Sequence, residues 1–245
     1  MTSLSVRTHW HHPEWVATAV SVAAWALLLG LTLTGRADLV ATHAPLPPLE
    51  TVGQALVMAA AMMTPLVLDQ ARHVAVSSLW KRRYRTILVF LAGYLTVWTV
   101  IGTMLMFAAS LVVGLVGWHL ATATSFVAAA FVTQSRSHAR WLRQCWATGP
   151  LAISGWRADL DALKFGVTTA LPCVAVTAPL MWAAAVAHGL VVMTAVTAVM
   201  VLERRRPPRE ARRLVPSVLA IGAAALLLGS IGMITGSEAV STHVH

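Results

Sequence analysis

The fold of this chain is decided by the stretch Thr51-Val-Gly-Gln-Ala-Leu-Val-Met-Ala-Ala-Ala-Met-Met-Thr-Pro-Leu-Val-Leu68. The stretch has no charged side chain and is about long enough for a helix to cross the roughly 30 Å hydrocarbon core of a bilayer. Because Pro65 has no backbone N–H, the carbonyl of Ala61 loses its helical donor. The sequence therefore predicts a membrane-spanning helix that kinks or ends at membrane depth.

The composition of the whole chain extends this interpretation. The chain has 245 residues, of which 58% are hydrophobic and 11% are charged, whereas a soluble domain is roughly 25% charged. We therefore expect an all-α, polytopic transmembrane helical bundle that forms a single domain over residues 1–245. The basic side chains lie in short loops between apolar segments, which is a signal of membrane topology. The expected partner is the lipid bilayer, and no nucleic acid is expected.

About seven apolar segments are expected to cross the membrane. They are separated by polar, basic or proline-containing loops. The segment 134–164 interleaves arginine with tryptophan, which favours the headgroup zone, so we expect part of it to lie along the cytoplasmic membrane surface. A helix that docks another protein is the alternative for this segment. The predicted spans are 15–34, 51–68, 86–116, 118–132, 165–187, 189–202 and 215–235.

Charge patterning predicts the orientation of these spans. If the N-terminus lies in the cytoplasm, every Lys and Arg except Arg36 falls on the cytoplasmic side, as the positive-inside rule requires. An odd number of spans then places the C-terminus outside. The sequence thus predicts a multi-pass protein with basic cytoplasmic loops.

Sulfur side chains are the candidate metal ligands. Met58 and Met62 are four residues apart, so they share one face of a helix, and Met63 lies beside them. Soft thioether sulfur suits monovalent copper, which is the expected cofactor. Methionine also fills gaps in apolar cores, and that packing role remains the competing interpretation.

The two cysteines separate by their place in the sequence. Cys173 lies in the span 165–187 between two prolines and is the better ligand candidate, facing Met58 and Met62 across the bundle. Cys145 falls in a cytoplasmic loop. No disulfide between them is expected, because cytoplasmic thiols are kept reduced and the two residues are predicted to lie at different depths.

Several short motifs carry a family resemblance. They span about residues 50–206 and together resemble the DUF2182 family of bacterial membrane proteins, which are described as predicted metal-binding proteins and sometimes as copper chaperones. The resemblance implies a place in the bacterial cytoplasmic (inner) membrane. Members of that family carry further cysteines where this chain has Gly149 and, after Cys173, Val176 and Thr177. The matching motifs are Met58-x-x-x-Met62-Met63-x-Pro65, Phe90-Leu-Ala-Gly93-Tyr94-Leu-Thr-Val-Trp98, Cys145, Cys173 and Leu202-Glu203.

Two classes of function stay open at this point. One is a non-catalytic membrane protein that binds or relays copper, in association with a copper-dependent membrane enzyme. The other is a structural accessory subunit of a larger membrane complex, such as a copper membrane monooxygenase or oxidase, without metal of its own. An enzyme is not expected, because the spans hold almost no ionisable residues and the common hydrolase and phosphate-binding motifs are absent from the sequence.

Overall fold

The computed structural model describes residues 12–34 and 47–205, and within these ranges it is all-helical. The predicted all-α class is therefore confirmed for the described part of the chain. The predicted span 215–235 lies outside the described residues. The elements are α2 (Trp15–Leu33), α4 (Pro48–Met63), η1 (Thr64–Val67), α5 (Leu68–Ser77), η2 (Trp80–Arg82), α6 (Arg83–Val116), α7 (Trp118–Thr133), α8 (Arg136–Gln144), α9 (Gly155–Ala187) and α10 (Leu190–Arg205).

Four helical segments are long and apolar enough to cross a membrane. They are Trp15–Leu33, Pro48–Ser77, Trp80–Val116 and Gly155–Ala187, and the shorter apolar helix α7 follows the third of them. The second segment is longer than the sequence indicated, because polar residues after Leu68 continue as α5. The fourth begins at Gly155, so the last part of the segment 134–164 belongs to α9. The length and composition of these helices are consistent with membrane association.

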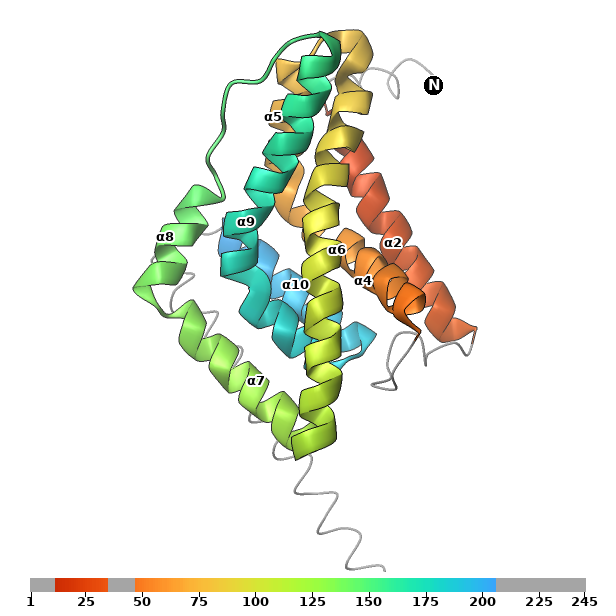
Figure 1. Ribbon diagram of the computed structural model, residues 1–245, viewed down its shortest axis with the longest axis vertical. Coiled ribbons are helices and arrows are strands. Elements are labelled where there is room, and N and C mark those ends of the chain that lie inside the picture. Colours follow the sequence, from red (N-terminus) through yellow and green to blue (C-terminus); the bar gives the residue numbers. More distant parts are fainter. Residues whose placement is uncertain (1–11, 35–46, 206–245) are drawn as a thin grey trace, which may run out of the picture.

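The long helices α6 and α9 form the centre of the bundle (Figure 1). They have 34 and 33 residues, and at 1.5 Å per residue each is about 50 Å long, which exceeds a bilayer core of about 30 Å. Helices α2 and α4 pack on one side of this pair, and α7 and α8 on the other. The first turns of α9 therefore project beyond the level at which α8 lies.

Two glycines allow α6 and α9 to approach closely. A Cβ atom at Gly93 would lie 2.5 Å from the backbone oxygen of Leu163, and one at Gly166 would overlap the backbone oxygen of Phe90. Small residues at such crossings let transmembrane backbones pack together. This contact fixes the height of α9 against α6, and it thereby aligns Cys173 with Tyr94.

The irregularity that the sequence predicted at Pro65 is present. α4 ends at Met63, and a 3₁₀ turn over Thr64–Val67 joins it to α5. The orphaned carbonyl of Ala61 accepts hydrogen bonds from Ser21 Oγ at 2.9 Å and from Trp25 Nε1 at 3.0 Å. Two side chains of α2 thus supply the donors that the proline removed, and this lets the kink exist inside an apolar bundle.

Candidate functional site

The candidate site begins at Cys173, in the middle of α9. Its side chain is 1% exposed, and its Sγ lies 3.2 Å from Tyr94 Oη on α6. Pro172 precedes it inside the helix. A buried thiol with a hydroxyl partner can lose its proton to a metal while the hydroxyl continues to donate to the sulfur.

Cys145 comes to the same place from a distant part of the chain. It is the C-cap residue of α8 and is 1% exposed. Its thiol interacts directly with that of Cys173, and this contact together with burial raises the pKa of the Cys145 thiol. Both cysteines are free. The expectation that they lie at different depths is wrong, because α9 starts well before the level of α8 and α8 folds back against it.

Side chains of α5 hold Cys145 in position. Gln70 Nε2 donates to the Cys145 carbonyl oxygen at 2.7 Å, and His73 Nε2 lies 3.1 Å from the carbonyl oxygen of Gly149. The loop after α8 is thus attached to α5 at two points. Since the sequence placed residues after Leu68 in a polar loop, this support was not foreseen.

A single arginine contacts both cysteines. Arg204, in the last turn of α10, donates from Nη2 to the Cys145 carbonyl oxygen at 3.1 Å, and its Nη1 lies 3.9 Å from Cys173 Sγ. Its guanidinium also stacks over the Trp146 ring, at 5.1 Å from the ring centroid. The positive charge lies where it can balance the negative charge that deprotonated thiols would bring.

Glu203, which precedes Arg204, connects α10 to α8. Glu203 Oε1 lies 2.6 Å from His138 Nε2, and both side chains are buried. Because Glu203 and Arg204 are consecutive, this contact also fixes the start of the Arg204 side chain. Leu202 and Glu203 belong to the motifs that carry the family resemblance. The next residue, Arg204, was not predicted as part of the site.

The methionine cluster reaches this site through Met63. Thr177 Oγ1 donates to the Cys173 carbonyl oxygen at 2.8 Å and lies 3.9 Å from Met63 Sδ. The thioether of Met63 therefore contacts Thr177, which lies one helical turn after Cys173 on α9. Met62 and Met58 are buried further back along α4, at 0% and 3% exposed. Of the three methionines predicted as ligands, the structure brings Met63 next to Thr177, and the metal role of all of them stays a prediction.

Sulfur is the donor type that this arrangement offers. Within the ranges 12–34 and 47–205, no group of three or more His, Cys, Asp or Glu side chains is placed to hold a metal ion. Two thiolates with a nearby thioether suit a soft ion of low coordination number such as Cu(I), and they suit hard oxygen-seeking ions poorly. The donor pair of Cys145 and Cys173 thus fits copper as a cargo, and the Met63 thioether contacts Thr177, one helical turn after Cys173.

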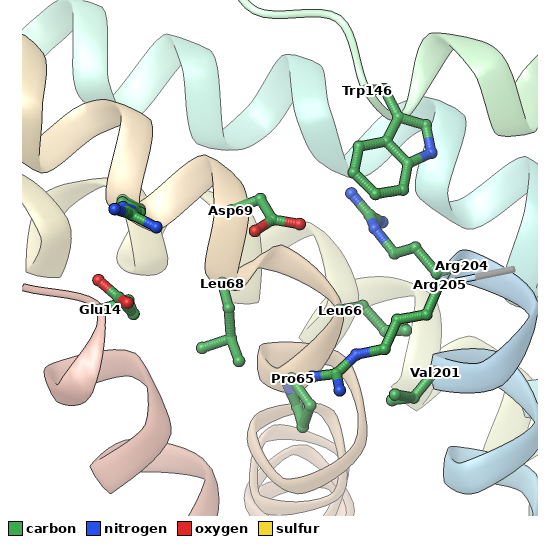
Figure 2. Close-up of a pocket in the computed structure, with 10 residues that line it drawn as sticks. Glu14, Pro65, Leu66, Leu68, Asp69, Trp146, Val201, Arg204 and Arg205 are labelled. Atoms are coloured by element: carbon green, nitrogen blue, oxygen red, sulfur yellow. The ribbon is translucent and has the colours of Figure 1, made fainter. Parts of the chain in front are cut away.

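A cavity of about 290 Å³ lies next to Arg204, the arginine that contacts both cysteines (Figure 2). Residues from four separate parts of the chain form its wall, and Arg204 and Trp146 belong both to this wall and to the surroundings of the cysteines. All four parts were predicted to lie on, or next to, the cytoplasmic side. The lining residues are Glu14, Pro65, Leu66, Leu68, Asp69, Arg72, Trp146, Val201, Arg204 and Arg205.

Comparison with known families decides the affiliation. The family model PpoB2, copper chaperone, matches residues 53–230. The chain belongs to this family. The match begins within α4 and includes the sulfur side chains and their partners from Met63 to Arg204. Among curated proteins and among solved structures, nothing matches the chain.

Membership in the PpoB2 family connects this chain with copper handling. It agrees with the copper-chaperone character implied by the sequence resemblance, and it suggests a non-catalytic role. One signal in the sequence could have indicated that the two cysteines lie together, namely that both belong to the motifs that carry the family resemblance. The motifs around Met63, Tyr94, Cys145, Cys173 and Glu203 were recognised separately, and the structure shows that they converge.

Proposed function

We propose that this protein holds Cu(I) between the sulfur atoms of Cys145 and Cys173 and relays it to a copper-dependent membrane enzyme. The observation that carries the proposal is the meeting of two buried, free thiols beside one guanidinium. Cu(I) binds thiolates strongly and accepts as few as two of them. Arg204 stabilises the charge of the complex, and the Met63 thioether, which contacts Thr177 one helical turn after Cys173, is the proposed third soft donor.

The Cys173 assignment was made from the sequence, and Cys145 is added here. The carbonyl of Cys145 is held by Gln70 and Arg204, so its thiol is fixed before metal arrives. Such preorganisation lowers the free energy spent on ordering the ligands. Met58 and Met62 form the apolar, polarisable lining behind Met63.

A Cu(I) competition experiment tests this function. The full-length protein in detergent, without oxygen, is titrated against a chromophoric Cu(I) chelator. We expect Cys145→Ser and Cys173→Ser each to lower the Cu(I) affinity by more than about a hundredfold, since each removes a ligand, and Met63→Leu by about tenfold. Leucine conserves the volume of methionine, so this swap should leave the fold intact.

The matched control is Met104→Leu. Met104 is 61% exposed on α6 and lies outside the site, so its replacement should leave the Cu(I) affinity unchanged. If both cysteine variants remain folded by circular dichroism and bind Cu(I) as the parent does, the proposal is wrong. The double variant Met58→Leu with Met62→Leu separates a ligand role of those methionines from packing.

A structural accessory subunit is the second candidate function. It is favoured by the apolar surface of the segment Trp80–Val116, in which only 11% of an apolar 18-residue stretch is buried. Such a surface suits lipid or the helices of other subunits of a copper-dependent oxidase or monooxygenase. Crosslinking in native membranes should give heteromeric products, whereas a monodisperse monomer without crosslinks would count against it.

The place of the protein in the cell forms part of the proposal. Four apolar segments of membrane-spanning length support a multi-pass protein of the bacterial cytoplasmic membrane. The basic turn η2 and the basic end of α10 would face the cytoplasm and His245 the outside. Reporter fusions near Arg204 and at His245 should report opposite sides, and finding both on one side would refute this topology.

A further inference from the structure

The wall of the cavity carries more positive than negative charge. Three arginines line it, against the two carboxylates of Glu14 and Asp69. In the described part of the chain, neither Arg72 nor Arg205 forms an ion pair, and Nε of Arg204 is buried without a hydrogen-bond partner. Guanidinium groups with unused donors are the usual recognition element for carboxylates and phosphates.

The position of the cavity adds a second requirement on its ligand. Arg204 lines the cavity and contacts both cysteines, so one side chain connects a ligand in the cavity with the cysteine pair. Figure 2 shows the guanidinium of Arg204 next to Trp146, and the side chain of Arg205 extending toward Pro65. The indole and the leucines of the wall suit the aliphatic part of a small organic molecule.

We propose that this cavity binds a small, carboxylate-bearing thiol that carries Cu(I), and that copper passes between this carrier and the cysteine pair. The inference rests on the proposed function of Cys145 and Cys173. The volume of about 290 Å³ lies at the lower end of small-molecule sites and fits a ligand the size of a short peptide. The arginines bind the carboxylates, and the carrier sulfur lies toward Arg204.

The transfer step is a ligand exchange without any redox change. A bond forms between Cu(I) and a cysteine sulfur, the bond between Cu(I) and the carrier sulfur breaks, and the proton of the cysteine thiol passes to the departing carrier thiolate. Copper remains Cu(I) throughout. Arg204 contacts the cavity and both cysteines, so it compensates the negative charge as it moves from one sulfur to the other.

Transfer kinetics test the proposal on the full-length protein. Cu(I) is supplied either on glutathione, which bears carboxylates, or on 2-mercaptoethanol, which does not. In the double variant Arg72→Gln with Arg205→Gln, we expect transfer from glutathione to slow about tenfold or more, and transfer from 2-mercaptoethanol to change by less than about twofold. The final amount of bound Cu(I) should stay the same, because the thiols are untouched.

The matched control is Arg143→Gln. Arg143 is exposed on α8, close to Cys145 in sequence, and does not line the cavity. The Arg143→Gln variant also loses positive charge, and it should receive copper from both carriers at the parent rate. Equal slowing with both carriers in the cavity variant, or no slowing with either, would overturn the proposal.

A ligand that cannot carry copper separates this inference from the function on which it rests. S-methylglutathione keeps the carboxylates and blocks the sulfur. By calorimetry it should bind the parent protein and the Cys145→Ser variant alike, and it should bind the double arginine variant at least about tenfold more weakly. Binding that survives in the arginine variant refutes the cavity site. Cu(I) binding by the cysteine variants tests only the proposed function: its loss supports a role of the two thiols in holding copper, and its persistence contradicts that role.

Discussion

The carbonyl of Ala61 offers a direct test of how the bundle tolerates its kink. Ser21 Oγ and Trp25 Nε1 donate to it at 2.9 and 3.0 Å, in place of the backbone N–H that Pro65 lacks. Each such bond contributes about 1 kcal/mol to the free energy of unfolding. We therefore expect Ser21→Ala and Trp25→Phe each to destabilise the protein by about 1 kcal/mol, because the other donor remains.

Removing both donors should have a larger effect than the sum of the two single changes. The carbonyl is then buried without any partner, which adds roughly 1–3 kcal/mol for its desolvation. The double variant should thus lose about 3–5 kcal/mol in all. The measurement is unfolding of the detergent-solubilised protein by a denaturing surfactant, followed by far-ultraviolet circular dichroism.

The background Pro65→Ala decides whether the reasoning is right. Alanine restores a backbone N–H four residues after Ala61, so the carbonyl regains a helical donor and the double substitution at Ser21 and Trp25 should become less destabilising by about 1–3 kcal/mol. The packing lost with the indole is the same in both backgrounds and cancels. Thr32→Ala is the control, because the hydroxyl of Thr32 bonds within α2 to Leu29. An equal loss of stability in both backgrounds would show that Ser21 and Trp25 do not replace the hydrogen-bond donor that Pro65 lacks.

Two further predictions concern the helix crossing and the proton linked to copper. Gly166→Ala should destabilise the protein by about 1–3 kcal/mol, because the added Cβ would overlap the backbone of Phe90. Gly114→Ala on α6 is the control, because its Cβ meets open space and should be tolerated. Unfolding by a denaturing surfactant measures the stability of both variants. Because contact with Cys173 and burial raise the pKa of Cys145, the metal-free protein keeps this thiol protonated near neutral pH, and Cu(I) must displace the proton. The proton of Cys145 alone should make the apparent Cu(I) affinity rise by at least about tenfold per pH unit between about pH 6 and 8, and an affinity independent of pH in a chelator competition would contradict the assignment.

Local chemistry explains why parts of the fold could be predicted. The apolar length of Trp15–Leu33 or of α6 is a property of consecutive residues, and a bilayer leaves such a run only the helix as a way to pair its backbone groups. The kink at Pro65 is equally local, since it follows from one missing N–H. The two polar helical segments were not predicted, because α5 and the first turns of α9 are stabilised by packing beyond the apolar runs that mark the membrane core.

The candidate site divides in the same way. Sequence pattern alone singled out Cys173 and the methionines Met58, Met62 and Met63 as soft donors, because that choice depends only on the type of side chain and its place in an apolar helix. The partnership of Cys173 with Cys145 depends on how far α9 projects, on how α8 folds back, and on the contacts of Gln70 and Arg204. These are distances between residues far apart in the chain. No local pattern encodes them, and so only the tertiary structure could bring the two thiols together.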